Sequence, residues 1–203
     1  FDGVNDNITI GDLDDIEGIS EMTWSVWYNW QGGHGSENVS KIISKDNTSG
    51  NASNRMHLKI DNCCVGNANS ILFMCNPNSS SNEAYGSTVV VDSLYHLVVV
   101  FNGNNVTNQE KLKIYINGVL QNTNYIGQFA TTTSSNNLPL IFGSDNNNDS
   151  YFNGLIDDIG IWNRALTEQE ITDLYTATTS STCIEISPSA DTLCAGESTT
   201  LTA

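Results

Sequence analysis

Basic residues are scarce in this sequence. Only 7 of its 203 residues are Lys or Arg, against 23 Asp and Glu, so the formal net charge is −16. A surface this acidic repels nucleic acid and anionic lipid, which argues against a nucleic-acid or membrane role. No apolar run approaches the roughly 20 residues that span a bilayer. The chain starts at Phe1 without a signal peptide, which indicates a mature or excised fragment.

The five cysteines lack a zinc-binding pattern, because no Cys-x-x-Cys pair or Cys/His cluster is present. Cys75 follows Cys63 and Cys64 closely enough for a hairpin disulfide, which would fit an oxidising compartment. The alternative is a set of buried free thiols, since five is an odd number and spacing fixes no pairing. Cys183 and Cys194 lie in the last part of the chain.

Short alternating runs predict an all-β fold, a two-sheet antiparallel β-sandwich. Residues 24–30 place Trp24, Val26 and Tyr28 on one strand face, and residues 55–60 alternate apolar and basic side chains. Residues 96–101 are continuously apolar, as in a central strand buried on both faces. The other predicted strands are residues 41–45, 71–75, 111–116, 119–121, 138–142 and 155–162.

One short C-terminal helix and one tight turn are also predicted. Thr167 and Glu170 form a capping box that begins a helix over 167–175. Asn117-Gly118 predicts a type I′ hairpin turn.

The composition divides the chain in two, a sandwich at 1–176 and a stub at 177–203. The stub begins with a Ser/Thr-rich linker over 176–182. It then carries two strand-like runs, at 184–186 and 199–202, as at the start of a second β domain.

Several stretches resemble the laminin-G-like (concanavalin A-like) jelly-roll family of large secreted bacterial proteins. They are FDGVND (1–6), MTWSVW (22–27), LYHLVV (94–99), LKIYINGVL (112–120) and NGLIDDIGIWNRAL (153–166). The resemblance implies a jelly roll over 1–176 and a secreted or cell-surface bacterial protein. LCAGES (193–198) resembles the start of an immunoglobulin-like module, which implies neighbouring modules in the same chain. The fold hosts lectins, carbohydrate-binding modules, adhesion domains and enzymes, so it fixes no single function.

Four of the seven basic residues fall between positions 41 and 59. Arg55, His57 and Lys59 share one strand face, and Lys41 and Lys45 share a face of the neighbouring run. If the two strands pair, these five residues predict a cationic patch that binds a sulfated or uronate-rich marine glycan. The alternative is that these cations pair locally with nearby acids.

Aromatic side chains are a second means of binding sugar, because a pyranose stacks its C–H face on an aromatic ring. Trp27, Trp30 and Tyr151 are the candidates. Trp24 and Trp162 are assigned to the core.

Two groups of acids are candidate calcium sites, because calcium prefers oxygen ligands. Asp2 near the start of the chain and Asp157 or Asp158 on the closing strand would be neighbours, since the ends of such sandwiches lie together.

A second calcium site rests on likeness alone. Asp46-Asn47 and the run of residues 145–149, beginning at Asp145, are similar to positions where pentraxins bind a ligand-bridging calcium. For both groups the alternative is that Asp and Asn simply make turns.

The sequence thus predicts a non-catalytic carbohydrate-binding module for a polysaccharide, appended to a secreted enzyme or surface protein. A retaining glycosidase needs two carboxylates about 5–5.5 Å apart, and no strand carries such an acidic stripe. A Gly-x-Ser-x-Gly elbow is also lacking. A structural or adhesive spacer is one alternative, and a glycoside hydrolase, or a polysaccharide lyase using Tyr95, His96 or His57, is another.

Overall fold

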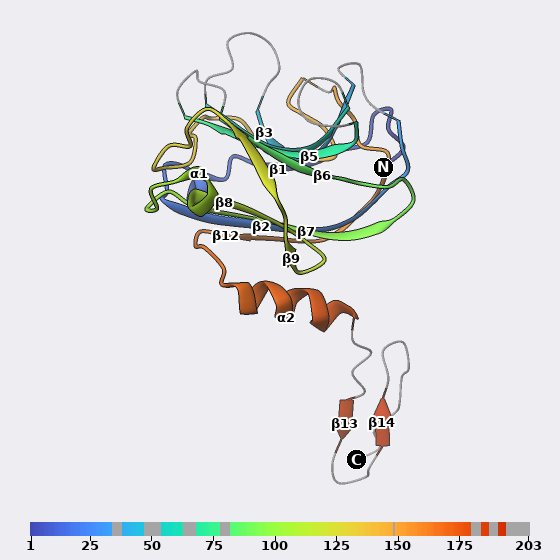
Figure 1. The fold of residues 1–203 in the computed structure, drawn as a ribbon. Helices are drawn as coiled ribbons and strands as arrows, with labels where there is room; N and C mark the ends of the chain where they lie inside the picture. Colours follow the sequence, from blue (N-terminus) through green and yellow to red (C-terminus); the bar gives the residue numbers. More distant parts are fainter. Residues whose placement is uncertain are drawn as a thin grey trace.

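The protein is a β-sandwich of two antiparallel sheets with helix α2 (Glu168–Thr179) against one outer side (Figure 1). This computed structural model describes residues 1–33, 38–46, 54–62, 68–77, 82–147 and 149–179, and the backbone of 184–186 and 191–193. The predicted all-β, two-sheet fold with a short C-terminal helix is confirmed.

The larger sheet has seven strands in the order β1-β11-β3-β4-β5-β6-β10. These strands are β1 (Ile8–Gly11), β3 (Val39–Lys45), β4 (Arg55–Asp61), β5 (Ser70–Asn76), β6 (Glu83–Thr88), β10 (Thr123–Ile126) and β11 (Leu140–Phe142). Among them, β1, β6 and β10 were not predicted as strands. The first resembling stretch, residues 1–6, forms no strand in the structure and makes a single bridge, between Asp2 and Asn153.

The smaller sheet has five strands in the order β12-β2-β7-β8-β9. These strands are β2 (Glu21–Trp30), β7 (Leu94–Asn102), β8 (Leu112–Ile116), β9 (Val119–Leu120) and β12 (Gly154–Trp162). The predicted type I′ turn joins β8 to β9, since Asn117 and Gly118 both have positive φ, 51° and 74°.

The core fills the space between the sheets with the apolar side chains of their inner faces. Trp24 of β2 and Phe73 of β5 meet edge to face there, with ring centroids 5.6 Å apart. Met56, Leu58 and Ile60 of β4 are fully buried, as their alternation predicts.

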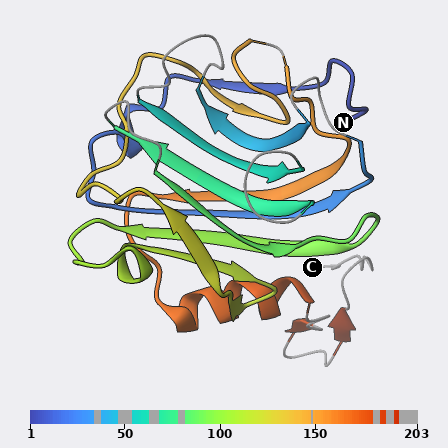
Figure 2. The ribbon, with the colours of Figure 1, turned by 45° about the horizontal axis from the view of Figure 1, so that its top comes forward.

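Helix α2 covers part of the outer face of the five-stranded sheet, on the side away from the seven-stranded sheet (Figures 1 and 2). A second apolar cluster lies beneath it, which includes Val98, Val100, Tyr115 and Ile171. The helix runs to Thr179, four residues beyond the predicted end, so the predicted linker begins as helix. No helix in the described ranges is both long and apolar enough to cross a membrane.

The remaining elements are short. A 3₁₀ helix η1 (Asp14–Ile16) follows β1, and α1 (Asn108–Lys111) precedes β8. Beyond α2, β13 (Ile184–Ile186) pairs with β14 (Asp191–Leu193). The strand predicted at 199–202 lies outside the described residues.

Cys75 is a buried free thiol in β5, so the predicted hairpin disulfide is wrong. Its Sγ lies 3.6 Å from Ser134 Oγ, and burial raises the pKa of the thiol to about 11. The other four cysteines lie outside the described residues.

Candidate functional site

A β-bulge divides the basic residues of β3. Strands β3 and β4 pair as predicted, and Lys41 lies opposite Lys59. The register then shifts between Lys41 and Ile43, so that Lys45 lies opposite the core residue Met56. Directly paired residues of antiparallel strands share a face, so Lys45 turns toward the inner face. The prediction that Lys41 and Lys45 share one face is wrong.

Lys41 is 1% exposed and lies between two fully buried acids. Its Nζ is 2.9 Å from both carboxylate oxygens of Asp46 and 3.3 Å from Asp145 Oδ2. His57, 3% exposed, places Nδ1 2.5 Å from Asp46 Oδ2. Burial lowers the pKa of His57 to about 4, so the imidazole is neutral at pH 7 and donates from Nδ1.

The Asp46 carboxylate is held ionised. Burial alone would raise its pKa, but the contacts with His57 and Lys41 hold that pKa well below its usual range.

Lys45 is fully buried in a second acidic setting. Its Nζ forms an ion pair with Asp12, lies 2.9 Å from Glu17 Oε1, and donates to the Leu138 carbonyl at 2.6 Å. Asp12 and Glu17, with Asp14, are the one group of three acids in the described part of the chain whose carboxylates converge closely. The Lys45 ammonium forms ion pairs with two of these three acids, Asp12 and Glu17.

The cationic patch predicted from Lys41, Lys45, Arg55, His57 and Lys59 is therefore not an exposed, unneutralised surface. Three of the five side chains are buried, Lys59 pairs with Asp61 at 3.4 Å, and Arg55 is partly buried in β4. Carboxylate or carbonyl oxygens also lie within ion-pair or hydrogen-bond distance of basic residues throughout the described chain, namely Lys41, Lys45, Lys59, Lys111, Lys113 and Arg164.

Trp27, a predicted sugar platform, lies beneath helix α2. Its ring stacks on His96 with centroids 5.0 Å apart and on Tyr175 of α2 at 5.8 Å, and it is 9% exposed. Trp30 is a core residue at 2% exposure. Tyr151 is partly exposed just before β12 and stays a prediction.

A Ser/His pair also lies in this stack. Ser25 Oγ is 2.8 Å from His96 Nε2, but both residues are buried and the rings of Trp27 and Tyr175 stack over the imidazole. Burial lowers the pKa of His96 to about 4. A substrate cannot reach this serine without displacing α2.

The calcium ligands predicted from Asp2, Asp157 and Asp158 are exposed, with Asp2 at an isolated bridge and the other two at a register shift within β12. Asp2 accepts hydrogen bonds from the backbone N–H groups of Val4 and Asn5, which lower the pKa of its carboxyl group. Asp157 accepts from the N–H of Asp158. The bridge between Asp2 and Asn153 brings the two segments together, and calcium there stays a prediction.

The second predicted calcium group does not fit the ion. Asp46 and Asp145 are bound to Lys41, whose ammonium is a cation and cannot be a metal ligand. Asn47 lies outside the described residues.

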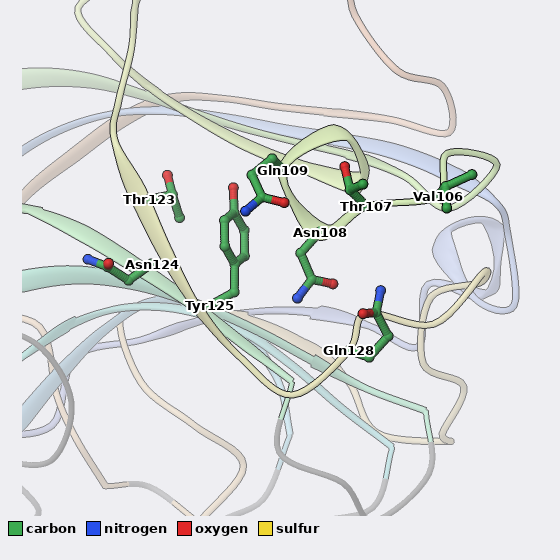
Figure 3. Close-up of a pocket in the computed structure, with 8 residues that line it drawn as sticks. All are labelled: Val106, Thr107, Asn108, Gln109, Thr123, Asn124, Tyr125 and Gln128. Atoms are coloured by element: carbon green, nitrogen blue, oxygen red, sulfur yellow. The ribbon is translucent and has the colours of Figure 1, made fainter.

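A pocket of about 510 Å³ opens between α1 and β10 (Figure 3). In Figure 3 the ring of Tyr125 lies between Asn124 and the side chains of α1. The lining carries no carboxylate, imidazole or basic group in the described residues. It consists of Val106, Thr107, Asn108, Gln109, Thr123, Asn124, Tyr125 and Gln128.

Hydrogen bonds fix the walls of this pocket. Asn108 donates to the Gly127 carbonyl at 2.9 Å and accepts from the Phe129 N–H at 3.0 Å, which ties α1 to the segment after β10. Tyr125 donates its hydroxyl to the Leu112 carbonyl at 3.0 Å and packs edge to face on Phe129. The ring orientation is therefore set before any ligand binds.

The sequence analysis did not identify this pocket, although one signal was present. Thr107 and Glu110 form a capping box, the same pattern that predicted α2 at Thr167. Residues 123–126 also alternate like a strand. The pairing of β10 with β6 at the edge of the seven-stranded sheet is a long-range relationship that no local pattern contains.

Comparison with known proteins identifies the fold family. A family model described as the concanavalin A-like lectin/glucanases superfamily matches residues 2–172. The adhesion G-protein coupled receptor D1 of Homo sapiens is 37% identical over 70 residues, 34% of this chain. The match spans 8% of the length of that relative.

Two solved structures are similar at low identity. One is the CBM40 of the Ruminococcus gnavus IT-sialidase bound to α2,3-sialyllactose, with TM-score 0.61, 17% identity, and coverage of 84% of this chain and 96% of that one. The other is botulinum neurotoxin type C, whose cell entry depends upon interaction with two ganglioside molecules. Its TM-score is 0.60 at 17% identity, with coverage of 88% of this chain and 41% of that one. At this identity the likeness shows the fold alone.

Proposed function

Because the chain belongs to the concanavalin A-like lectin/glucanases superfamily, we propose that it is a non-catalytic carbohydrate-binding module. We assign its site to the pocket between α1 and β10. The observation that carries the proposal is the lining itself, which combines amide and hydroxyl side chains with one tyrosine ring and no catalytic acid.

This lining matches the chemistry of a sugar. Each amide of Gln109, Asn124 and Gln128 offers both donor and acceptor groups, as a sugar hydroxyl does. The Tyr125 ring offers an apolar face against which the C–H groups of a pyranose pack. The bound glycan loses little to reorganisation of the site, because Tyr125 and Asn108 are already held in place.

The ligand we propose is an uncharged glycan. The anionic glycan expected from the sequence depended on an exposed cationic patch, but three of its five residues are buried, Lys59 pairs with Asp61, and Arg55 is partly buried. The pocket lining has no basic group to offset the net charge of −16, so a sulfated or uronate-rich chain would be repelled. The sialylated ligand of the CBM40 supports the carbohydrate class and not the charge.

Two features support binding without cleavage. Asp46, Asp145, Asp12 and Glu17 are engaged by buried lysines, so they are not available as a catalytic pair. Among the described residues that line the pocket there is no carboxyl or imidazole group, and the Tyr125 hydroxyl donates a hydrogen bond to the Leu112 carbonyl.

The proposed setting is a secreted or cell-surface bacterial protein with neighbouring modules. A single open pocket of this kind binds weakly. A higher overall affinity would come from avidity among modules that contact the same polysaccharide.

Affinity electrophoresis tests the proposal. Uncharged polysaccharides such as xylan and galactomannan should retard the native chain, and alginate and carrageenan should not. Tyr125→Ala should abolish the retardation, while the exposed amide variant Gln169→Ala on α2 should retain it. No retardation by any polysaccharide would favour a structural or adhesive spacer, and release of reducing ends or unsaturated products would establish an enzyme.

A further inference from the structure

We propose that the ammonium group of Lys41 takes the place of a bound metal ion in this sandwich. The acids that likeness marks as calcium ligands, Asp46 and Asp145, would then require no metal at all. The inference does not depend on the proposed carbohydrate site, which lies on other elements.

The contacts of the ammonium group are complete. Lys41 Nζ has three N–H donors, and three carboxylate oxygens lie around it. Two belong to Asp46, both at 2.9 Å, and the third is Asp145 Oδ2 at 3.3 Å. One side chain thus bridges the segments that follow β3 and β11, as a bridging ion would.

The two carboxylates also accept hydrogen bonds from donors other than Lys41. Asp145 Oδ1 accepts the backbone N–H groups of Asn147 and Asp149, at 2.9 and 3.1 Å. Asp46 Oδ2 lies 2.5 Å from His57 Nδ1. While Lys41 is present, its ammonium occupies the point between these carboxylates, and its charge repels a calcium ion. The native geometry therefore suits an ammonium ion, and the carboxylates become open to calcium only when Lys41 is removed.

A lysine can stabilise the two acids in place of a metal ion because its charge is covalently attached to the chain. Two carboxylates with 0% exposure would be unstable without a positive charge close by. A free ion stabilises a fold only while its concentration exceeds its dissociation constant. Lys41 is part of β3, so its charge is delivered by folding itself.

The same arrangement occurs a second time on β3. Lys45 is fully buried and is bound to Asp12, Glu17 and the Leu138 carbonyl. Strand β3 therefore supplies a buried cation to each of two acidic groups. This repetition argues against a chance placement of Lys41.

The test measures the Lys41 ammonium directly in the native chain. In protein labelled with ¹⁵N-lysine, a buried ammonium gives a slowly exchanging Nζ signal, which is assigned by its loss in Lys41→Gln. Adding millimolar calcium should leave this signal unmoved. A calcium-dependent shift or loss of the signal would show that the ion displaces the lysine, and would overturn the proposal.

A melting experiment gives the converse result. Lys41→Gln should lower the melting temperature by on the order of 10 °C in chelator, and calcium should recover much of that loss. In the control Lys113→Gln, the changed residue forms an exposed ion pair with Glu168. Its melting temperature should fall by about 2 °C or less, and calcium should raise it no more than it raises that of the native chain. If calcium raises the melting temperature of Lys41→Gln no more than it raises that of the native chain, the acid pair is not a cation site. If Lys41→Gln does not fold in chelator, its refolding in calcium decides the matter, with recovery in support and failure in both conditions against.

Discussion

Tyr175 of helix α2 stacks on Trp27 of strand β2 with ring centroids 5.8 Å apart and an interplanar angle of 19°. The contact closes the outer face of the five-stranded sheet over His96, whose ring is 6.0 Å from that of Tyr175. It makes a residue that sequence reasoning assigned to sugar binding part of a helix docking surface.

Tyr175→Ala should weaken the docking of α2. Loss of the stacked ring should lower the free energy of unfolding by about 2 kcal/mol, since aromatic pairs contribute beyond their buried area. The native tryptophan emission should shift to the red as Trp27 gains water. Urea denaturation and fluorescence measure both effects. Thr172→Ala, exposed on the same helix, should stay within about 0.5 kcal/mol. An unchanged emission spectrum would contradict the stacked arrangement.

Acid should destabilise the fold through its buried histidines. Burial lowers the pKa of His96, and that of His57, to about 4 from the usual 6.5. Between these values the unfolded chain binds protons that the native chain does not. Stability is therefore complete above pH 6.5 and falls as the pH drops toward 4, at most by about 3 kcal/mol for each histidine.

The measurement is the free energy of unfolding at a series of pH values for the native chain and His96→Gln. The variant should have a lower stability at pH 7 and a shallower decline between pH 6.5 and 4. Equal slopes would mean that His96 is already protonated in the folded protein.

Sequence patterns recovered the sandwich but none of the residues of the proposed site. The alternation of Met56, Leu58 and Ile60 fixed the inner face of β4, because a two-residue period has one physical meaning there. The same reasoning failed for Lys45, since the bulge after Lys41 depends on how two strands align in three dimensions.

The burial of the charged side chains of Lys41 and Lys45 was also not predictable from the sequence. Lysine is rarely buried unless it is paired, and the partners of Lys41 and Lys45 include Asp145 and Asp12, far away along the chain. Spacing within a strand says nothing about such distant acids. The pocket escaped for the same reason, because α1 and β10 meet only through the crossing of the chain from one sheet to the other.

Cys75 should react only in the unfolded chain. Its thiol is 1% exposed, and burial raises its pKa to about 11, so little thiolate exists at neutral pH. Peptide mapping after iodoacetamide treatment should show Cys75 unmodified in buffer and fully modified in guanidinium chloride. Modification of Cys75 at comparable rates in both conditions would show that β5 opens readily.

The calcium site predicted from Asp2, Asp157 and Asp158 is tested separately from the Lys41 group. If Asp2 and Asp157 or Asp158 hold the ion, calcium should raise the melting temperature of the native chain over that in chelator. The double variant Asp157→Asn/Asp158→Asn should lose this rise, and Asp173→Asn on α2 should keep it. Equal melting temperatures with calcium and chelator would remove the proposed ion.

The central claim is that an uncharged glycan binds between α1 and β10, and side-chain amide signals report on that pocket directly. The ¹⁵N-labelled chain would be titrated with an oligosaccharide from a neutral polysaccharide that retards it in electrophoresis. The titration should shift the NH₂ signals of Gln109, Asn124 and Gln128. The dissociation constant should be the same at low and high salt. Shifts confined to Arg55, Lys59 or Tyr151, with those amides unmoved, would contradict the assignment.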